Sequence, residues 1–435
     1  MIYLIVEHEI RRDLMNKKTK VLTIIGIAVA AAAGLGIFGY NFAEIKAGSK
    51  IENISKVSEP YLGFTLPANA KVIGLGEATH GNSDFQALKL DLLKKLVNEE
   101  GVRSFALEAD YSGGVIVNKY IHGEEADVNK AVSALLFRIY KTEDVKEMLE
   151  WMKSYNDTAS EADKLNFYGY DMQNSENNIS VLQDYCKDID ELKDLVGQMA
   201  PAASTDYSAD TKPSDEEVSK ATAAVDKVEE YISNKADQTF LEKELLIAAE
   251  NVDLCIENGK KFGPAGNIYR DEKMSEIVEK IRTLEESLGR EKIMIAGHIG
   301  HIAKKGSTYK NMGSILKEKF GDEYFVIGTD FFKTECNIGG SSGRKNYKVC
   351  SADPLAAQAK DMPDGKYYLD FSKVGKDLSG VYENVYSKSV NGNLGEAFTP
   401  VYYFIRLYRT EIAPADYYDS MIYVYDAKPL RLLDM

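Results

Sequence analysis

Short apolar runs that end at ionisable residues recur along this chain. The four runs, each with the ionisable residues that follow it, are Val72–Gly76 before Glu77 and His80, Ser104–Leu107 before Glu108, Phe167–Tyr170 before Asp171, and Ile293–Gly297 before His298 and His301. Apolar runs of this length are typical of buried strands in a parallel sheet. Because ligands bind outside the carboxyl ends of such strands, we expect these polar side chains to form one site along one sheet edge.

A helix with a single apolar stripe is predicted after the first run. It covers about Phe85 to Glu100, and Gly101 is a typical C-terminal stop. The stripe consists of Leu88, Leu92, Leu93 and Leu96. Since a strand follows at Arg103–Leu107, this helix is long enough to connect two parallel strands.

The middle of the chain is predicted to be mostly helical. Helical spacing of apolar residues runs over 114–160, and a third strand follows at Asn166–Tyr170. From about 175 to 261 the pattern is again helical apart from the polar loop Pro201–Pro213, and Ser214–Glu217 is a capping box that opens a new helix. This stretch predicts a helical insertion in an α/β core.

The α/β alternation resumes after the insertion. Helices are predicted at Asp271–Leu288 and Gly313–Lys319, and strands at Lys292–Gly297 and Tyr324–Thr329. Further short, partly antiparallel strands are predicted at Lys366–Phe371, Val401–Leu407 and Met421–Tyr425. The predicted units are 1–45 (tail and apolar segment), 55–175 (first part of the α/β core), 176–265 (helical insertion) and 266–435 (second part of the core with a C-terminal α+β region).

The start of the chain predicts contact with a membrane. Val21–Tyr40 contains no charged residue, and an apolar run of this length can span a bilayer. Five basic residues precede it: Arg11, Arg12, Lys17, Lys18 and Lys20. This arrangement indicates an N-terminal apolar helix, either a retained anchor or a cleaved secretory signal. The basic flank places the N-terminus in the cytoplasm and everything after about Phe42 outside the cell membrane. Met15 is an alternative start.

Composition narrows the class of partner. The 435 residues are 44% hydrophobic and carry a formal net charge of −15, which argues against a nucleic-acid surface. Four cysteines, Cys186, Cys255, Cys336 and Cys350, fit an exported protein with one or two disulfides, and free buried thiols are an equal alternative. Cys336 with Cys350 is the favoured pair, since the two enclose a Gly/Ser-rich loop.

The turn from Gly76 to Gly81 holds the densest candidate chemistry. Its histidine, His80, has a side chain whose pKa suits proton transfer near neutrality, and Glu77 could orient that imidazole. His298 and His301 are three residues apart after another strand. The sequence allows four roles for them: proton donors, oxyanion stabilisers, metal ligands, or histidines at a helix start whose hydrogen bonds are made with backbone groups. The sequence contains no GxSxG nucleophile turn. Two candidate mechanisms remain: attack by a water molecule that a histidine activates, and catalysis by a metal ion held by the same Glu and His residues.

Together these residues resemble the erythromycin esterase family over about 60–430. The resemblance rests on GEATHG at 76–81, Leu107-Glu108, Gly169-Tyr170-Asp171, Arg270-Asp271 followed by Met274, and His298-x-x-His301. It implies a three-layer α/β core with a mainly parallel sheet, a helical insertion and a smaller α+β part. The family often has Arg where this chain has Lys89, and Asn where it has Ile299.

The resemblance also implies roles for the site residues. His80 would be the general base that activates water, Glu77 and Glu108 would organise the site, and His298 would support the substrate or intermediate. To substrate binding we assign Lys89, Asp171, His301 and Arg270, with no metal or other cofactor.

We therefore expect an exported, membrane-tethered hydrolase. Its partners would be a small-molecule ester or related acyl substrate and, through the N-terminal segment, the membrane, with no nucleic acid. Two alternatives remain open: a metal-dependent hydrolase or peptidase that uses the same Glu/His cluster, and a non-catalytic surface binding protein of the same fold.

Overall fold

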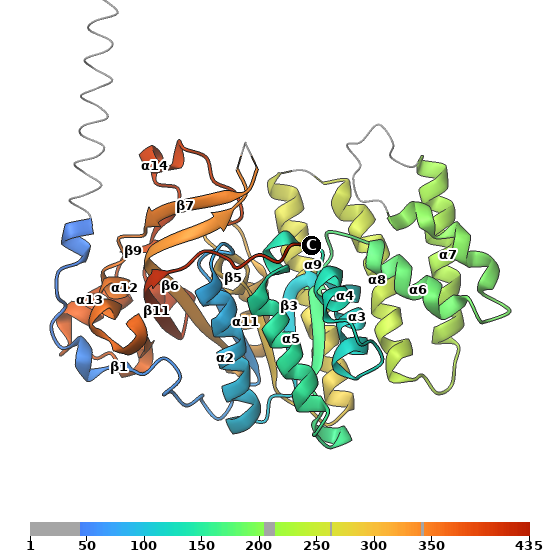
Figure 1. Ribbon diagram of the computed structural model, residues 1–435, viewed down its shortest axis with the longest axis horizontal. Helices are drawn as coiled ribbons and strands as arrows, with labels where there is room; N and C mark the ends of the chain where they lie inside the picture. Colours follow the sequence, from blue (N-terminus) through green and yellow to red (C-terminus); the bar gives the residue numbers. More distant parts are fainter. Residues whose placement is uncertain (1–43, 204–213, 262, 341–342) are drawn as a thin grey trace, which may run out of the picture.

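A mainly parallel sheet runs through the centre of the molecule (Figure 1). The structure is a computed structural model that describes residues 44–203, 214–261, 263–340 and 343–435. The predicted N-terminal apolar helix lies outside these residues. Its role as an anchor or a signal therefore stays a prediction. Within the described ranges, no helix has both the length and the apolar character needed to cross a membrane.

Nine described strands form the sheet, in the order β1-β8-β11-β6-β2-β5-β3-β4, with β7 paired to β6 outside this path. Their bounds are β1 Ser58–Glu59, β2 Val72–Glu77, β3 Ser104–Asp110, β4 Asn166–Asp171, β5 Ile293–His298, β6 Tyr324–Ile338, β7 Lys345–Cys350, β8 Lys366–Asp370 and β11 Ser420–Ala427. The six strands from β11 to β4 in this order are parallel, whereas β1, β8 and β7 pair antiparallel. The α/β class with a mainly parallel sheet is therefore confirmed.

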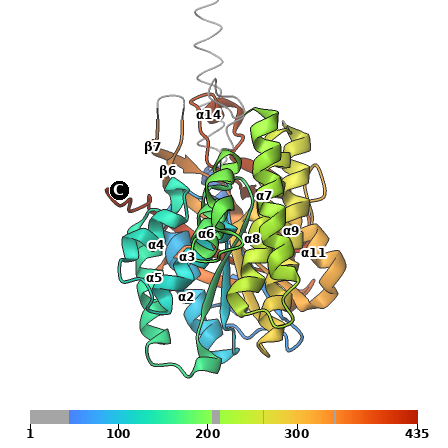
Figure 2. The same ribbon diagram turned by 90° about the vertical axis from the view of Figure 1, so that its right-hand side faces the viewer.

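Helices cover both faces of the sheet (Figures 1 and 2). Along β2, Ile73 and Leu75 belong to the apolar cluster under α2 (Ser83–Glu99) and α5 (Glu143–Asn156), whereas Val72 belongs to the cluster under α9 (Pro264–Ser287) and α11 (Met312–Phe320). This alternation is what a strand buried on both faces requires. The longer helices are α2 Ser83–Glu99, α3 Tyr111–Ile121, α4 Val128–Ala134, α5 Glu143–Asn156, α6 Glu176–Cys186, α7 Asp215–Ser233, α8 Phe240–Gly259, α9 Pro264–Ser287, α11 Met312–Phe320 and α13 Ser379–Tyr386.

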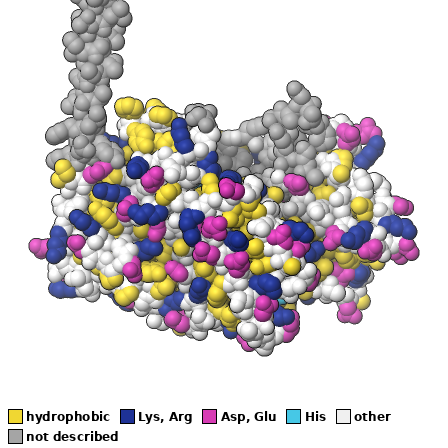
Figure 3. Space-filling model, in the orientation of Figure 1, with side chains coloured by type: hydrophobic (Ala, Val, Ile, Leu, Met, Phe, Trp, Pro, Cys, Tyr) yellow, Lys and Arg dark blue, Asp and Glu magenta, His cyan; other side chains and the backbone are white. Residues whose placement is uncertain are grey.

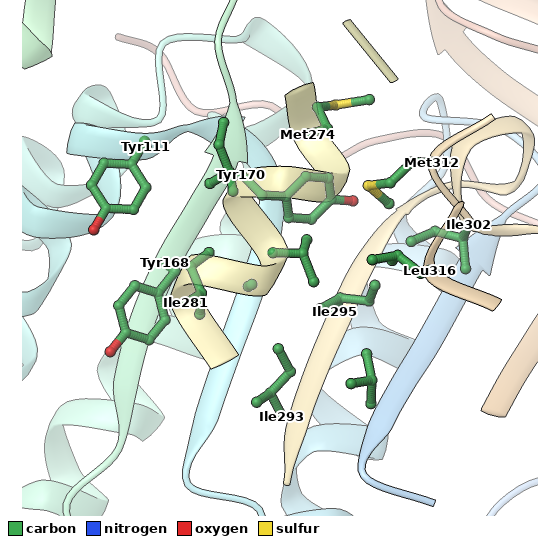
Figure 4. Packing of buried hydrophobic residues seen from close by; sticks show 14 of the residues in the cluster. Tyr111, Tyr168, Tyr170, Met274, Ile281, Ile293, Ile295, Ile302, Met312 and Leu316 are labelled. Carbon is green, nitrogen blue, oxygen red and sulfur yellow. The ribbon is translucent and has the colours of Figure 1, made fainter. Parts of the chain in front are cut away.

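The long helix α9 packs directly on the sheet (Figure 4). Met274 and Ile281 of α9 lie in the same buried cluster as Ile293 and Ile295 of β5. The helix begins at Pro264, seven residues before the predicted start, because Pro is well suited to the first helical position. Consequently Arg270 lies on a rigid helix over the sheet.

Helices α6, α7 and α8 form a helical unit at one side of the sheet (Figures 1 and 2). The predicted capping box at its second helix is confirmed: the Ser214 hydroxyl accepts from the Glu217 backbone N–H, and the Glu217 carboxylate accepts from the Ser214 N–H. The division of the chain into four units stays a prediction.

One predicted strand is wrong. Residues 401–407 read as a strand, but they contain a short exposed helix, α14 (Tyr402–Ile405), which ends at Arg406 in the left-handed conformation. The remaining short α-helices and strands of the described residues are α10 Ile299–Ile302, α12 Pro354–Gln358, α15 Pro414–Tyr417 and the two-stranded ribbon of β9 Ser389–Gly392 with β10 Arg409–Ile412. Local backbone bonds close the segment 401–407 into helical turns in place of a strand, among them Ile405 N–H to the Val401 carbonyl at 3.1 Å and Arg406 N–H to the Tyr402 carbonyl at 2.7 Å.

The four cysteines are free and buried, and all of them lie in the described part of the chain. The favoured Cys336–Cys350 disulfide is therefore wrong and the free-thiol alternative holds. Cys350 faces Lys333 across the β6–β7 ladder and Cys336 faces Tyr347, so the two cysteines are not opposite each other.

Candidate active site

The strand ends named in the sequence meet at one edge of the sheet. Glu77 of β2 is in register with His298 of β5, and β3 lies on the other side of β5. The rings of His80 and His298 have centroids 5.0 Å apart, and those of His298 and His301 are 6.4 Å apart. Three histidines from two distant segments therefore share one site.

Backbone hydrogen bonds hold the turn that carries His80. The Ala78 N–H donates to Thr329 Oγ1 at 3.2 Å, and the Ala78 carbonyl accepts from the Leu394 N–H at 2.7 Å. After the turn, Asn82 caps α2 by accepting from the Phe85 N–H at 2.9 Å. The His80 backbone is thus fixed between β2, β6 and the start of α2.

Glu77 links a lysine to His80. One oxygen of its carboxylate, Oε2, accepts from Lys89 Nζ at 2.6 Å, and the other, Oε1, is 2.8 Å from His80 Nδ1. Lys89 also donates to Gln86 Oε1 at 2.9 Å. Burial alone raises the pKa of Glu77, but the Lys89 charge and the His80 hydrogen bond outweigh it and leave that pKa lowered.

The contacts from Lys89 through Glu77 to His80 determine which nitrogen of His80 is basic. An ionised carboxylate can only accept, so His80 Nδ1 carries the proton and donates to Glu77. The lone pair is then on Nε2, which has no hydrogen-bond partner among the described residues. A neutral histidine held in this way is poised to take a proton from a bound water.

His298 is held in the opposite arrangement. Its Nδ1 accepts from the Gly300 N–H at 3.2 Å, where it caps the short helix α10. The proton is therefore on Nε2, an atom that is buried and without a partner among the described residues. Burial lowers the pKa of His298 to about 3, and the neighbouring His80 adds to this effect. His298 is thus a neutral hydrogen-bond donor beside His80.

Arg270 joins the ends of β3 and β4. Its Nε and Nη2 donate to the two oxygens of Asp171 at 3.0 and 2.7 Å, and Nη2 also donates to Glu108 Oε1 at 2.7 Å. Glu108 Oε2 accepts from the His298 N–H at 2.6 Å. Burial raises the pKa of Glu108, but His301 and Arg270 outweigh it, and the resulting pKa is well below the usual range.

His301 belongs to this second network. Arg270 Nη1 can only donate and is 3.1 Å from His301 Nε2, so that nitrogen accepts. His301 Nδ1 then donates to Asp271 Oδ1 at 2.7 Å, and Asp271 Oδ2 accepts from the Tyr309 hydroxyl at 2.7 Å. The pair His298 and His301 therefore differ: one offers a free N–H, and the other is fully engaged.

Gly297 is required by close packing at this edge. A Cβ there would lie 2.7 Å from Glu108 Oε2 and still closer to the Tyr170 hydroxyl. That hydroxyl donates to the Ala296 carbonyl at 2.8 Å. The glycine thus lets Glu108 approach the strand that carries His298.

The part of the site around His80 is nearly closed to solvent, whereas His298, His301 and Arg270 are partly exposed. His80 is 8% exposed, Glu108 6%, Glu77 and Lys89 1% each, and Asp171 is fully buried. Lys89, predicted to bind substrate, lies behind Glu77 in this arrangement. Among the described residues, no group of three or more His, Cys, Asp or Glu is placed to hold a metal ion. Glu77 instead faces Lys89, and Glu108 and Asp171 both face Arg270.

Two contributors, Tyr309 and Gln86, were not singled out by the sequence, and a third, Asp271, was named in a motif but was given no role in the site. Asp271 adjoins the predicted Arg270 on α9, so an acid beside a candidate site cation was the available signal. Tyr309 comes from an irregular loop with no periodicity. Gln86 lies one helical turn before Lys89 on α2, a spacing at which side chains meet.

A model of a protein family described as erythromycin esterase matches residues 97–427. The chain is 24% identical to erythromycin esterase type II from Escherichia coli over 293 residues, which are 60% of this chain and 68% of that protein. It is 22% identical to the putative hydrolase YbfO from Bacillus subtilis (strain 168) over 350 residues, 72% of this chain and 77% of the relative. The family match begins after the turn that holds His80.

Solved structures share the fold. A Bacillus cereus protein superposes with a TM-score of 0.72 at 17% identity, over 90% of this chain and 99% of the other. A succinoglycan biosynthesis protein gives 0.69 at 19% identity, over 88% and 98%. A mutant of the erythromycin esterase EreC in its open conformation gives 0.57 at 15% identity, over 84% and 93%.

Proposed function

Because the chain belongs to the erythromycin esterase family and so to a group of hydrolases, we propose that it hydrolyses an ester with a water molecule activated by His80. The observation that carries the proposal is the chain of contacts Lys89–Glu77–His80, which leaves His80 Nε2 basic and unpartnered among the described residues. We place the reaction outside the cytoplasmic membrane, because a basic flank and an apolar run precede the described residues.

In the proposed reaction, water attacks the carbonyl carbon while His80 Nε2 takes one of its protons. The imidazolium that forms is stabilised by the Glu77 carboxylate, 2.8 Å from Nδ1. A tetrahedral intermediate with a negative oxygen results. When it collapses, the C–O bond to the alcohol breaks and His80 returns the proton to the leaving oxygen, which gives one acid and one alcohol.

His298 is the proposed donor to the negative oxygen. Its buried Nε2–H lacks a partner among the described residues, and an oxyanion would supply one. Because burial keeps His298 neutral, the donor is in place at all pH values above its lowered pKa.

Arg270, Glu108, Asp171 and His301 are proposed to position this donor. Glu108 accepts from the His298 N–H and is itself held by Arg270, so the cation on α9 fixes the end of β5. Loss of Arg270 or Glu108 would then lower turnover, because His298 would be misplaced. In this proposal the substrate itself contacts His80 and His298.

The test is hydrolysis of a broad panel of esters by the full chain with His80→Asn. We expect a loss on the order of 10²–10⁴ in turnover, which is what a general base contributes. His122→Asn is the matched control, since His122 pairs with Asn166 at the opposite end of β4. Equal turnover by wild type and His80→Asn would contradict the proposal.

Treatment with a chelator separates this proposal from the metal-dependent alternative. A water activated by His80 alone predicts unchanged hydrolysis after the metal is stripped and the chelator removed. Lost activity that a divalent cation restores would instead favour a metal held by the same residues. The absence of turnover on every ester, with ligand binding unaffected by His80→Asn, would favour a binding protein.

A further inference from the structure

An apolar tip projects from the molecule at α14. In this segment Phe404 is 72% exposed, Leu407 58%, Ile405 57% and Val401 51%. Figure 3 shows hydrophobic side chains gathered at the upper edge, where Figure 1 places α14. Monomeric proteins seldom expose several large apolar side chains together, and such clusters mark sites of interaction.

The tip is held firmly from below. Phe398 is buried, and its ring centroid is 4.5 Å from that of Tyr347 on β7 and 4.9 Å from that of Tyr403. Backbone bonds between Gly339 and residues 396–398 tie the same segment to the end of β6. The segment that carries the exposed apolar side chains therefore packs on buried aromatic rings, which fix its position on the surface.

Basic residues lie beside the apolar tip. A cavity of about 820 Å³ is lined by Lys46, Lys50, Lys388, Arg406 and Arg409, with Glu411 as its one acidic lining residue. Arg406 belongs to the tip itself, directly after α14. In a chain whose formal net charge is −15, this local excess of positive charge stands out.

The same surface lies where the described chain begins. Lys46 and Lys50 come from its first residues, and Ile45 beside them is 73% exposed. In Figures 1 and 2, α14 lies at the upper end of the molecule, and in Figure 1 the first described residues lie at the left edge, below α14. In the sequence, Val21–Tyr40 precedes them with no charged residue over a bilayer-spanning length.

We propose that the α14 tip and the adjoining basic cavity dock on a bilayer that contains anionic phospholipid. Phe404, Ile405 and Leu407 would enter the boundary between headgroups and acyl chains, and the lysines Lys46, Lys50 and Lys388 would face the lipid phosphates. An apolar face bordered by Lys and Arg is the pattern of interfacial binding. Basic residues near an anionic leaflet add attraction that salt screens.

The test is the depth of residue 404 in the full chain reconstituted into vesicles. Phe404→Cys carries an environment-sensitive fluorophore; the four native cysteines are buried and do not compete. The vesicles are an equimolar mixture of phosphatidylcholine and phosphatidylglycerol, with a nitroxide quencher on the acyl chains. Glu230→Cys on α7, in the distant helical unit, is the matched control.

We expect a blue shift and severalfold stronger quenching at 404 than at 230. Quenching should fall when Lys46→Glu and Lys388→Glu are combined, but not with Lys220→Glu and Lys227→Glu on α7, which change the net charge equally. Equal quenching at 404 and 230 overturns the proposal. A blue shift without quenching also overturns it, because a second copy or another part of the chain then covers the tip.

Discussion

At the scale of single residues, the partner at Nδ1 decides what each histidine offers at Nε2. His80 Nδ1 donates to a carboxylate, whereas His298 Nδ1 accepts from a backbone N–H. With ring centroids only 5.0 Å apart, one side chain presents a lone pair and the other a proton. Base and donor are thus distinguished by their hydrogen bonds alone, with the same side-chain chemistry.

The lowered pKa of His298 predicts a dependence of stability on pH. Burial puts this pKa at about 3 in the folded state, against an ordinary value near 6.5. At pH values between these two, the unfolded chain binds a proton at His298 that the folded chain does not bind. The free energy of unfolding therefore falls as the pH drops. From about pH 7 to about pH 5 the loss is up to about 2 kcal/mol.

Chemical denaturation of wild type and His298→Asn at the two pH values measures this effect. Asn cannot titrate, so the variant should lose less stability on acidification than the wild type. Identical losses in both proteins would show that His298 does not take up the proton on unfolding.

Lys89 provides a second prediction at this scale. Lys89→Met leaves the buried Glu77 carboxylate without its cation, and removal of one partner of a buried pair typically costs about 3–5 kcal/mol. Hydrolysis should fall as well, because Glu77 would no longer hold His80. Lys89→Arg keeps the charge and is the matched control. Stability and turnover are measured together, and full activity in Lys89→Met would rule out this role.

At the scale of elements, the strand ends were predictable and their partners were not. Continuous apolar runs and the sharp change from apolar to ionisable residues indicated where β2, β3, β4 and β5 stop. The pairing of Arg270 with Asp171 depends on where α9 crosses the sheet, which no local pattern encodes. Likewise, the apolar and aromatic residues 401–407 read as a strand, because local propensity carries no information on whether a sheet edge is near.

Gly297→Ala tests the packing between β5 and its neighbours. The added methyl group would press on Glu108 and on the Tyr170 hydroxyl, so we expect lower stability and lower turnover together. Adding Tyr170→Phe removes the hydroxyl and should recover part of the loss. Gly197→Ala is the control, since a Cβ there meets no atom within 4 Å. A neutral Gly297→Ala in thermal unfolding and ester hydrolysis would refute the packing argument.

At the scale of the whole molecule, the site depends on strands that come late in the sequence. β2 lies between β5 and β6, and both of these follow residue 290. The chain therefore completes the surroundings of Glu77 and His80 only after the helical unit has been made. The order of strands could not be predicted from the sequence, since each apolar run alone is compatible with any neighbour.

A chain that ends at Leu288 should accordingly fail to fold cooperatively. It keeps β3 and β4 as a pair but deprives β2 of both neighbours. We expect near-ultraviolet circular dichroism and a single unfolding transition to be lost while helical signal persists. Supplying residues 289–435 as a second chain is the complementing control. A sharp transition in the shortened chain alone would show that the first part is an independent folding unit.

The position of β2 between two late strands also has a consequence for synthesis on the ribosome. Glu77 emerges about 200 residues before β5, which at about 5–20 residues per second is a delay of roughly 10–40 s. During that time a mostly apolar strand with two unpaired edges is exposed to other nascent chains. Chaperone capacity during translation, more than the stability of the finished molecule, is therefore expected to limit how much active protein a cell accumulates.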